Sequence, residues 1–114
     1  MTNLERLKLE LSNKEYYTDD EYTVFLEENN LTPTDAYDKT TMQIKLLETV
    51  VTVLETLAND VDLMRKIQTD DVATIDQAYE WLEKRLNALK NKIQELKIQE
   101  DEEYSCIKPL FFNR

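Results

Sequence analysis

Carboxylates are the side chains in this sequence that could do chemistry, because Asp and Glu make up 24 of the 114 residues while histidine is absent. The closest groupings are Asp60 with Asp62 and the run Asp19-Asp20-Glu21. A calcium loop needs a central glycine, which the chain lacks, and acid–base catalysis needs carboxylates that converge in an apolar pocket. We interpret these groups as helix caps and solvated surface, and we predict no enzymatic activity, no metal site and no cofactor.

The single cysteine, Cys106, has no histidine to activate it, so we interpret it as a small hydrophobic residue that forms no disulfide within the chain. The absence of glycine also excludes P-loop and Rossmann loops. No signal segment opens the chain, which favours a cytosolic origin. The longest apolar region, residues 42–67, carries seven charged side chains, so we expect no membrane-spanning helix.

The charge of the chain is strongly acidic and unevenly distributed. The formal net charge is −10, with 14 basic and 24 acidic side chains. Residues 1–40 hold four basic and ten acidic side chains, whereas residues 74–98 hold five basic and four acidic ones. Affinity for nucleic acid comes mainly from Lys and Arg that neutralise phosphates, so we predict no sequence-specific nucleic-acid binding.

Two capping-box patterns mark the first helices. Thr2 with Glu5, and Thr18 with Glu21, have the three-residue spacing in which hydroxyl and carboxylate each accept from the amide of the other residue. They predict amphipathic helices over residues 3–11 and 19–28. Thr32-Pro33 resembles a cap followed by proline at the first helical position, and it predicts a third, short helix with Ala36 and Tyr37 turned inward.

A broad apolar stripe predicts a buried helix over residues 41–67, which Asn59-Asp60 can divide into a long helix and a short continuation. A second long helix follows over residues 75–98, and we expect the acidic run at 99–103 to end it because acidic groups are unfavourable at a helix C-terminus. Its apolar residues alternate at spacings of four and three, the heptad pattern of a packing seam. The seam consists of Ile75, Tyr79, Leu82, Leu86, Leu89, Ile93 and Leu96.

This seam can pack within the chain or between two chains in a coiled coil. It spans just over three heptads, and Tyr79 at an a-type position fits an intrachain core better, so we favour intrachain packing. Trp81 lies off the seam, either on a second packing face or as an exposed anchor. We therefore predict an all-α fold, a small bundle of four or five helices with a long C-terminal helix and an extended C-terminal arm. Residues 1–98 form the helical domain, and residues 99–114 form an acidic hinge and an aromatic tail.

The C-terminal tail is apolar, aromatic and interrupted by Pro109. It can fold back onto the core, or it can bind a groove or sheet edge of a partner. Burial of two phenylalanines would contribute on the order of 3–6 kcal/mol before the cost of ordering the tail. The candidate residues for binding a partner protein or a neighbouring subunit are Tyr104, Ile107, Leu110, Phe111 and Phe112.

The layout of the chain resembles that of the small head-tail connector (adaptor, head-completion) proteins of long-tailed phages and prophages. The resemblance lies in the opening stretch at residues 3–11, the acidic stretch at 19–26, the long apolar helix, and the further helix and tail. The resemblance implies a homo-oligomeric ring beneath the portal that continues the DNA channel. It also implies contacts with portal and neck or tail proteins, docking through Leu110, Phe111 and Phe112, and a place in the virion neck after assembly in the host cytoplasm.

The regular heptad helix departs from what a connector requires, and it leaves room for another tail, neck or baseplate component. Two other classes remain alternatives. One is an acidic phage-encoded inhibitor or regulator that mimics DNA, and the other is a coiled-coil adaptor dimer. An inhibitor would require carboxylates spaced like phosphates, and it would give the aromatic tail no task.

Overall fold

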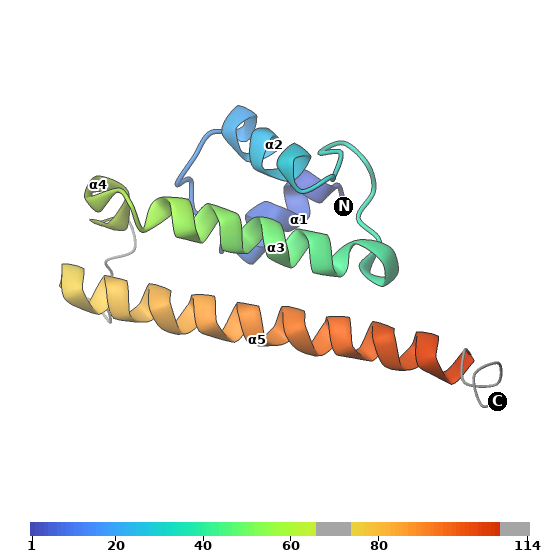
Figure 1. Ribbon diagram of the computed structural model, residues 1–114. Helices are drawn as coiled ribbons and strands as arrows, with labels where there is room; N and C mark the ends of the chain where they lie inside the picture. Colours follow the sequence, from blue (N-terminus) through green and yellow to red (C-terminus); the bar gives the residue numbers. More distant parts are fainter. Residues whose placement is uncertain (66–73, 108–114) are drawn as a thin grey trace.

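The fold is a bundle of helices, seen in a computed structural model that describes residues 1–65 and 74–107, without the side chains of Val61 and of residues 101–107. The described residues form five helices and a single isolated β-bridge, between Thr2 and Ala36. The predicted all-α fold with a long C-terminal helix is confirmed (Figure 1). The helices are α1 (Asn3–Glu10), α2 (Asp19–Glu28), α3 (Lys39–Leu57), α4 (Val61–Met64) and α5 (Ile75–Ile107).

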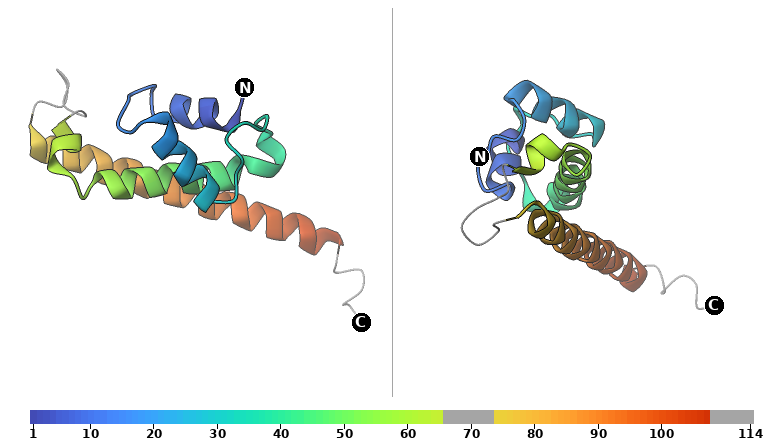
Figure 2. Two further views of the ribbon diagram at one scale, coloured as in Figure 1. Left: turned by 90° about the horizontal axis from the view of Figure 1, so that it is seen from above. Right: turned by 90° about the vertical axis from the view of Figure 1, so that its left-hand side faces the viewer.

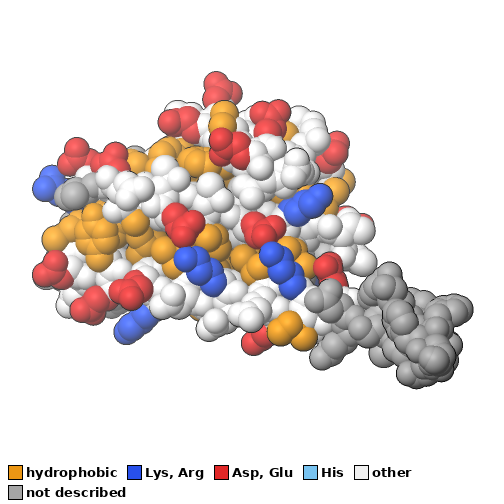
Figure 3. All heavy atoms as spheres, in the orientation of Figure 1, with side chains coloured by type: hydrophobic (Ala, Val, Ile, Leu, Met, Phe, Trp, Pro, Cys, Tyr) orange, Lys and Arg blue, Asp and Glu red, His pale blue; other side chains and the backbone are white. Residues whose placement is uncertain are grey.

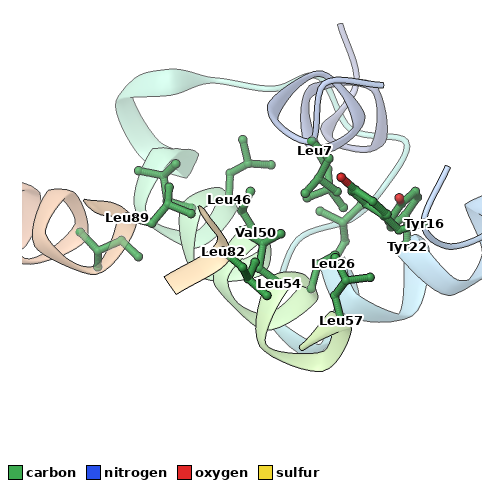
Figure 4. Packing of buried hydrophobic residues seen from close by; sticks show 14 of the residues in the cluster. Leu7, Tyr16, Tyr22, Leu26, Leu46, Val50, Leu54, Leu57, Leu82 and Leu89 are labelled. Carbon is green, nitrogen blue, oxygen red and sulfur yellow. The ribbon is translucent and has the colours of Figure 1, made fainter. Parts of the chain in front are cut away.

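Helix α3 is the centre of the bundle. The end-on view in Figure 2 shows α1, α2 and α5 around it on three sides, and each of them packs against it. The broad stripe of α3 serves these contacts, because Leu46, Val50, Val53 and Leu57 are fully buried. They lie between side chains such as Leu7 of α1, Leu26 of α2 and Leu82 of α5 (Figure 4).

Both capping boxes form as predicted. At α1, the Glu5 amide donates to the Thr2 hydroxyl at 3.2 Å, and the Thr2 amide donates to the Glu5 carboxylate at 2.8 Å. At α2, the corresponding bonds between Thr18 and Glu21 measure 3.2 and 2.9 Å. The hydrogen bond from Thr2 lowers the pKa of the Glu5 carboxyl below its ordinary value. Each box satisfies two backbone donors that a helix start otherwise leaves unpaired.

The prediction of a short helix after Thr32-Pro33 is wrong. Residues 33–35 form a turn and a bend, and Ala36 is exposed in the bridge to Thr2 rather than buried. Tyr37 is partly buried against the core, as expected. The carbonyls of this segment accept from the first turn of α1, because the Asn3 amide donates to Asp35 and the Leu4 amide donates to Pro33. Carbonyls used in this way are not available for a helix of their own, so the segment caps α1 instead.

Helices α3 and α5 run antiparallel, and two ion pairs set their register. Glu48 meets Lys97 and Glu55 meets Lys90, each at 3.1 Å, so a step of seven residues on one helix matches seven on the other. Figure 3 shows acidic and basic side chains side by side along this junction, with hydrophobic atoms between them. The break expected near Asn59 is also present, since it separates α3 from α4.

The prediction that the last helix ends near Ile98 is wrong, because α5 continues to Ile107. The acidic run at 99–103 therefore lies inside the helix. The dipole effect that disfavours acidic groups is confined to the last turn, which begins after this run. Glu and Gln are good helix formers, and the chain has no glycine or proline between Ile98 and Pro109 to stop the helix.

Candidate functional site

The candidate functional site is a groove between α1 and α5 with α3 as its floor, which we name the α1–α5 groove. It consists of two adjoining hollows of about 190 and 150 Å³ that share Glu10 and Arg85. The larger hollow is bordered by Arg6, Tyr37, Gln43, Leu46, Leu47, Ala88, Leu89 and Lys92. The smaller hollow is bordered by Leu11, Ser12, Lys14, Tyr16, Leu54 and Trp81.

Glu10 divides the groove and binds both of its walls. Its Oε2 lies 2.8 Å from Nη1 of Arg6, one turn back on α1, and its Oε1 lies 3.1 Å from Nη2 of Arg85 on α5. The Arg6 guanidinium also lies 5.5 Å from the centre of the Tyr37 ring. The carboxylate is largely buried, with a side-chain exposure of 18%. These contacts hold α1 and α5 at a fixed separation.

The groove is basic although the protein is acidic. Its charged residues are Arg6, Lys14, Arg85 and Lys92 against the single carboxylate of Glu10, a local balance of four positive charges to one negative. The whole chain has a net charge of −10. A local excess of positive charge in such a chain favours an acidic partner at this groove over other surfaces.

An aromatic pair closes one end of the groove. Trp81 stands 41% exposed at the rim, and Tyr16 is buried below it together with Leu11 and Leu54. Burial raises the pKa of the Tyr16 hydroxyl to about 12, with a smaller contribution from Tyr22. This end of the groove therefore combines apolar and aromatic side chains with the positive charge of Lys14.

The loop that borders this end has two consecutive residues in the left-handed region. Ser12 has φ of 60° and Asn13 has φ of 57°, and neither is glycine. Each left-handed residue other than glycine costs about 1 kcal/mol or more, with Asn tolerating the region best. The Asn13 amide donates to the Lys8 carbonyl at 2.8 Å, and such bonds at the end of α1 hold the loop in place.

The structure places the heptad seam inside the chain. Leu82, Leu89 and Ile93 are buried in the core, and Tyr79, Leu86 and Leu96 are partly buried against it. The intrachain packing favoured from the sequence is therefore the arrangement seen here. Trp81 lies off the seam, at the rim of the groove.

The side chains of the predicted tail residues lie outside the part of the chain that the structure describes. Tyr104 and Ile107 belong to the last turns of α5, with side chains outside the described residues, as is that of Cys106. Leu110, Phe111 and Phe112 lie beyond the described residues altogether. The partner-binding role predicted for these five residues therefore stays a prediction.

The carboxylates that were considered for chemistry cap helices or form ion pairs within the fold. Asp60 accepts from the amides of Asp62 and Leu63 at the start of α4, and Asp19 pairs with Lys8 at 3.0 Å. The partner Asp19 raises the pKa of the Lys8 ammonium. Among the described residues, no three Asp, Glu, Cys or His side chains are grouped as a metal ion would need. Within the same residues, no helix is long and apolar enough to cross a bilayer.

The α1–α5 groove was missed from the sequence because its basic residues are spread from position 6 to position 92 and meet only in the folded chain. The available signal was the shift from an acidic N-terminal part to a balanced region at residues 74–98. That shift indicates where basic residues are relatively frequent, but it does not say which of them share a surface.

Comparisons of the chain with protein-family models, with curated proteins and with solved structures found no match.

Proposed function

We propose that this protein is a structural subunit of a phage head-tail junction, a connector that forms a homo-oligomeric ring below the portal and docks through its C-terminal segment. The observation that carries the proposal is the length of α5. Leu96, Gln99 and Glu100 lie level with the first residues of α3, where they share a hollow with Lys39 and Ile44. Helix α5 then continues seven residues further, about 10 Å at the standard rise.

This extension carries the chain away from its own bundle (Figure 1). A segment that leaves the body of a subunit is suited to reach another protein, and in this chain it leads to Leu110, Phe111 and Phe112. Large aromatic side chains are the residues that most often anchor an interface. The seam of α5 is occupied within the chain, so a coiled-coil dimer through that seam would have to open the core.

The acidic surface over α2 supports the same proposal. Asp19, Asp20, Glu21, Glu27 and Glu28 lie on this helix without a basic residue among them, and acidic side chains gather over it in Figure 3. Carboxylates repel the phosphate backbone. A channel lined by such helices would let DNA pass without holding it.

The test combines light scattering with electron microscopy and portal binding, using the full chain and the portal protein encoded in the same genome. We expect particles of ring size with a central opening, alone or on the portal. The double variant Phe111→Ala/Phe112→Ala, and deletion of residues 108–114, should lose portal binding while circular dichroism shows unchanged helicity.

A matched control is Leu9→Ala, which changes an exposed apolar side chain on α1 and should bind the portal as the wild type does. Loss of helicity in the tail variants would show that the tail belongs to the core. A chain that stays monomeric with and without the portal would overturn the proposal, and a stable dimer would favour the coiled-coil adaptor.

A further inference from the structure

The α1–α5 groove has a partner of opposite charge within the same sequence. The segment at residues 99–103 reads Gln-Glu-Asp-Glu-Glu and carries four acidic residues and no basic one. It belongs to the part of α5 that passes the end of α3. The groove carries four basic side chains around one carboxylate that they already neutralise in part.

This acidic segment cannot reach the groove of its own chain. Lys92 and Glu100 lie on one helix, eight residues or about 12 Å apart along its axis, so a continuous helix holds them at that separation. Residues 101–103 lie further still along the same axis. Contact between the acidic segment and the α1–α5 groove therefore requires two molecules of the chain.

We propose that the acidic end of α5, residues 99–103, lies in the α1–α5 groove of the next copy of the chain. The contact joins two different surfaces, so each subunit offers an acidic end to one neighbour and a groove to the other. Head-to-tail contacts of this kind close into a ring when the rotation between subunits allows it. The inference rests on the proposed ring and assigns its subunit contact, and it leaves Phe111 and Phe112 for the portal.

The charges of the groove suit a segment with acidic side chains. Lys14 and Lys92 lie at its two ends, and the Glu10 contacts to Arg6 and Arg85 fix its walls before a partner arrives. A preformed site loses less conformational entropy on binding. Charged pairs at a partly exposed interface are weakened by salt, so the assembly should dissociate as ionic strength rises.

The test is a charge swap in the full chain, followed by light scattering. The groove-reversed variant is Lys14→Glu/Lys92→Glu, and the end-reversed variant is Glu100→Lys/Glu103→Lys. We expect each to fall to the monomer mass of 13.6 kDa with unchanged helicity. A 1:1 mixture of the two should assemble again, because each variant then finds a complementary surface on the other.

Two controls change the charge elsewhere, by −2 and +4, against −4 for the groove-reversed and +4 for the end-reversed variant. Lys84→Glu alters an exposed lysine of α5 that does not border the groove, and Glu27→Lys/Glu28→Lys alters exposed acids of α2. Both should keep the wild-type mass, so a general effect of net charge would be recognised.

The outcomes separate this inference from the proposed function. Rings that persist in the groove-reversed variant, or reversed variants that stay monomeric when mixed, would overturn the groove contact and leave the connector proposal intact. A wild-type chain that is monomeric at every salt concentration, both free and with the portal, would overturn both. Loss of the ring in the Lys84→Glu control would also overturn the specific contact.

Discussion

Glu10 of α1 and Arg85 of α5, 75 positions apart in the sequence, form an ion pair with an N–O distance of 3.1 Å. The same carboxylate also holds Arg6 at 2.8 Å. One side chain thus links the N-terminal helix to the C-terminal helix across α3 and divides the α1–α5 groove.

Replacement Glu10→Gln should destabilise the protein by about 1–3 kcal/mol, because it removes charge-assisted hydrogen bonds from two arginines. The matched control is Glu55→Gln, which breaks the pair with Lys90. Both of those side chains are 52% exposed, so the control should cost about 0–1 kcal/mol. Urea unfolding followed by circular dichroism measures both values. Equal losses would show that the partial burial of Glu10 adds nothing.

Replacement Leu57→Ala should cost about 2–5 kcal/mol, because this last side chain of α3 is fully buried in the core. The control Leu9→Ala removes the same atoms from a side chain that is 47% exposed, and it should change the free energy of unfolding by less than about 0.5 kcal/mol. Chemical denaturation of the two variants gives the comparison. A small loss for Leu57→Ala would contradict the central place of α3.

Replacement Thr18→Ala should destabilise the protein by about 0.5–2 kcal/mol through loss of the cap on α2. Thr34→Ala, in the exposed turn before α3, serves as the control because the Thr34 side chain caps no helix in the described structure. Thermal unfolding should show a lower midpoint for the first variant and a nearly unchanged one for the second. Equal midpoints would mean that the capping box is dispensable.

Tyr16 should set an alkaline limit to stability. Burial raises its pKa from 10.0 to about 12 in the folded state, so the folded chain resists its ionisation. The stabilisation is complete below pH 10 and is lost as the pH rises through about 12, since the unfolded state releases this proton first. Tyrosinate absorbance and circular dichroism recorded together should show a late ionisation that coincides with loss of helix.

The variant Tyr16→Phe supplies the control for that titration. It should lack the late ionisation and keep its helicity to higher pH than the wild type does. A late phase that survives the substitution would assign it to another tyrosine, and helicity that is lost at the same pH in both proteins would separate the ionisation from unfolding.

The parts of the fold that were predictable from sequence are those with local signals. Helix α2 has its Thr18–Glu21 capping box and its apolar spacing within ten consecutive residues, and its bounds agree with the prediction. The turn at 32–37 was mistaken for a helix because its carbonyls serve Asn3 and Leu4, and a partner thirty residues away leaves no local pattern. The end of α5 was misplaced because a rule for the last turn was applied to acids that lie before that turn.

The α1–α5 groove belongs to the features that local signals cannot give. Arg6 and Lys92 border one hollow only because α3 brings α1 and α5 together. Sequence spacing carries no information about such pairs until the topology of the bundle is known. The candidate site therefore came from the structure, whereas most of the helices came from the sequence.

The central position of α3 has a consequence for how the folded chain opens. Because α1, α2 and α5 all pack against this one helix, its amides at Val50 and Val53 should exchange with solvent only when the whole chain unfolds. Such a protein passes between folded and unfolded states in a single cooperative step. In the proposed ring, each copy of the chain would then enter the assembly fully folded or not at all.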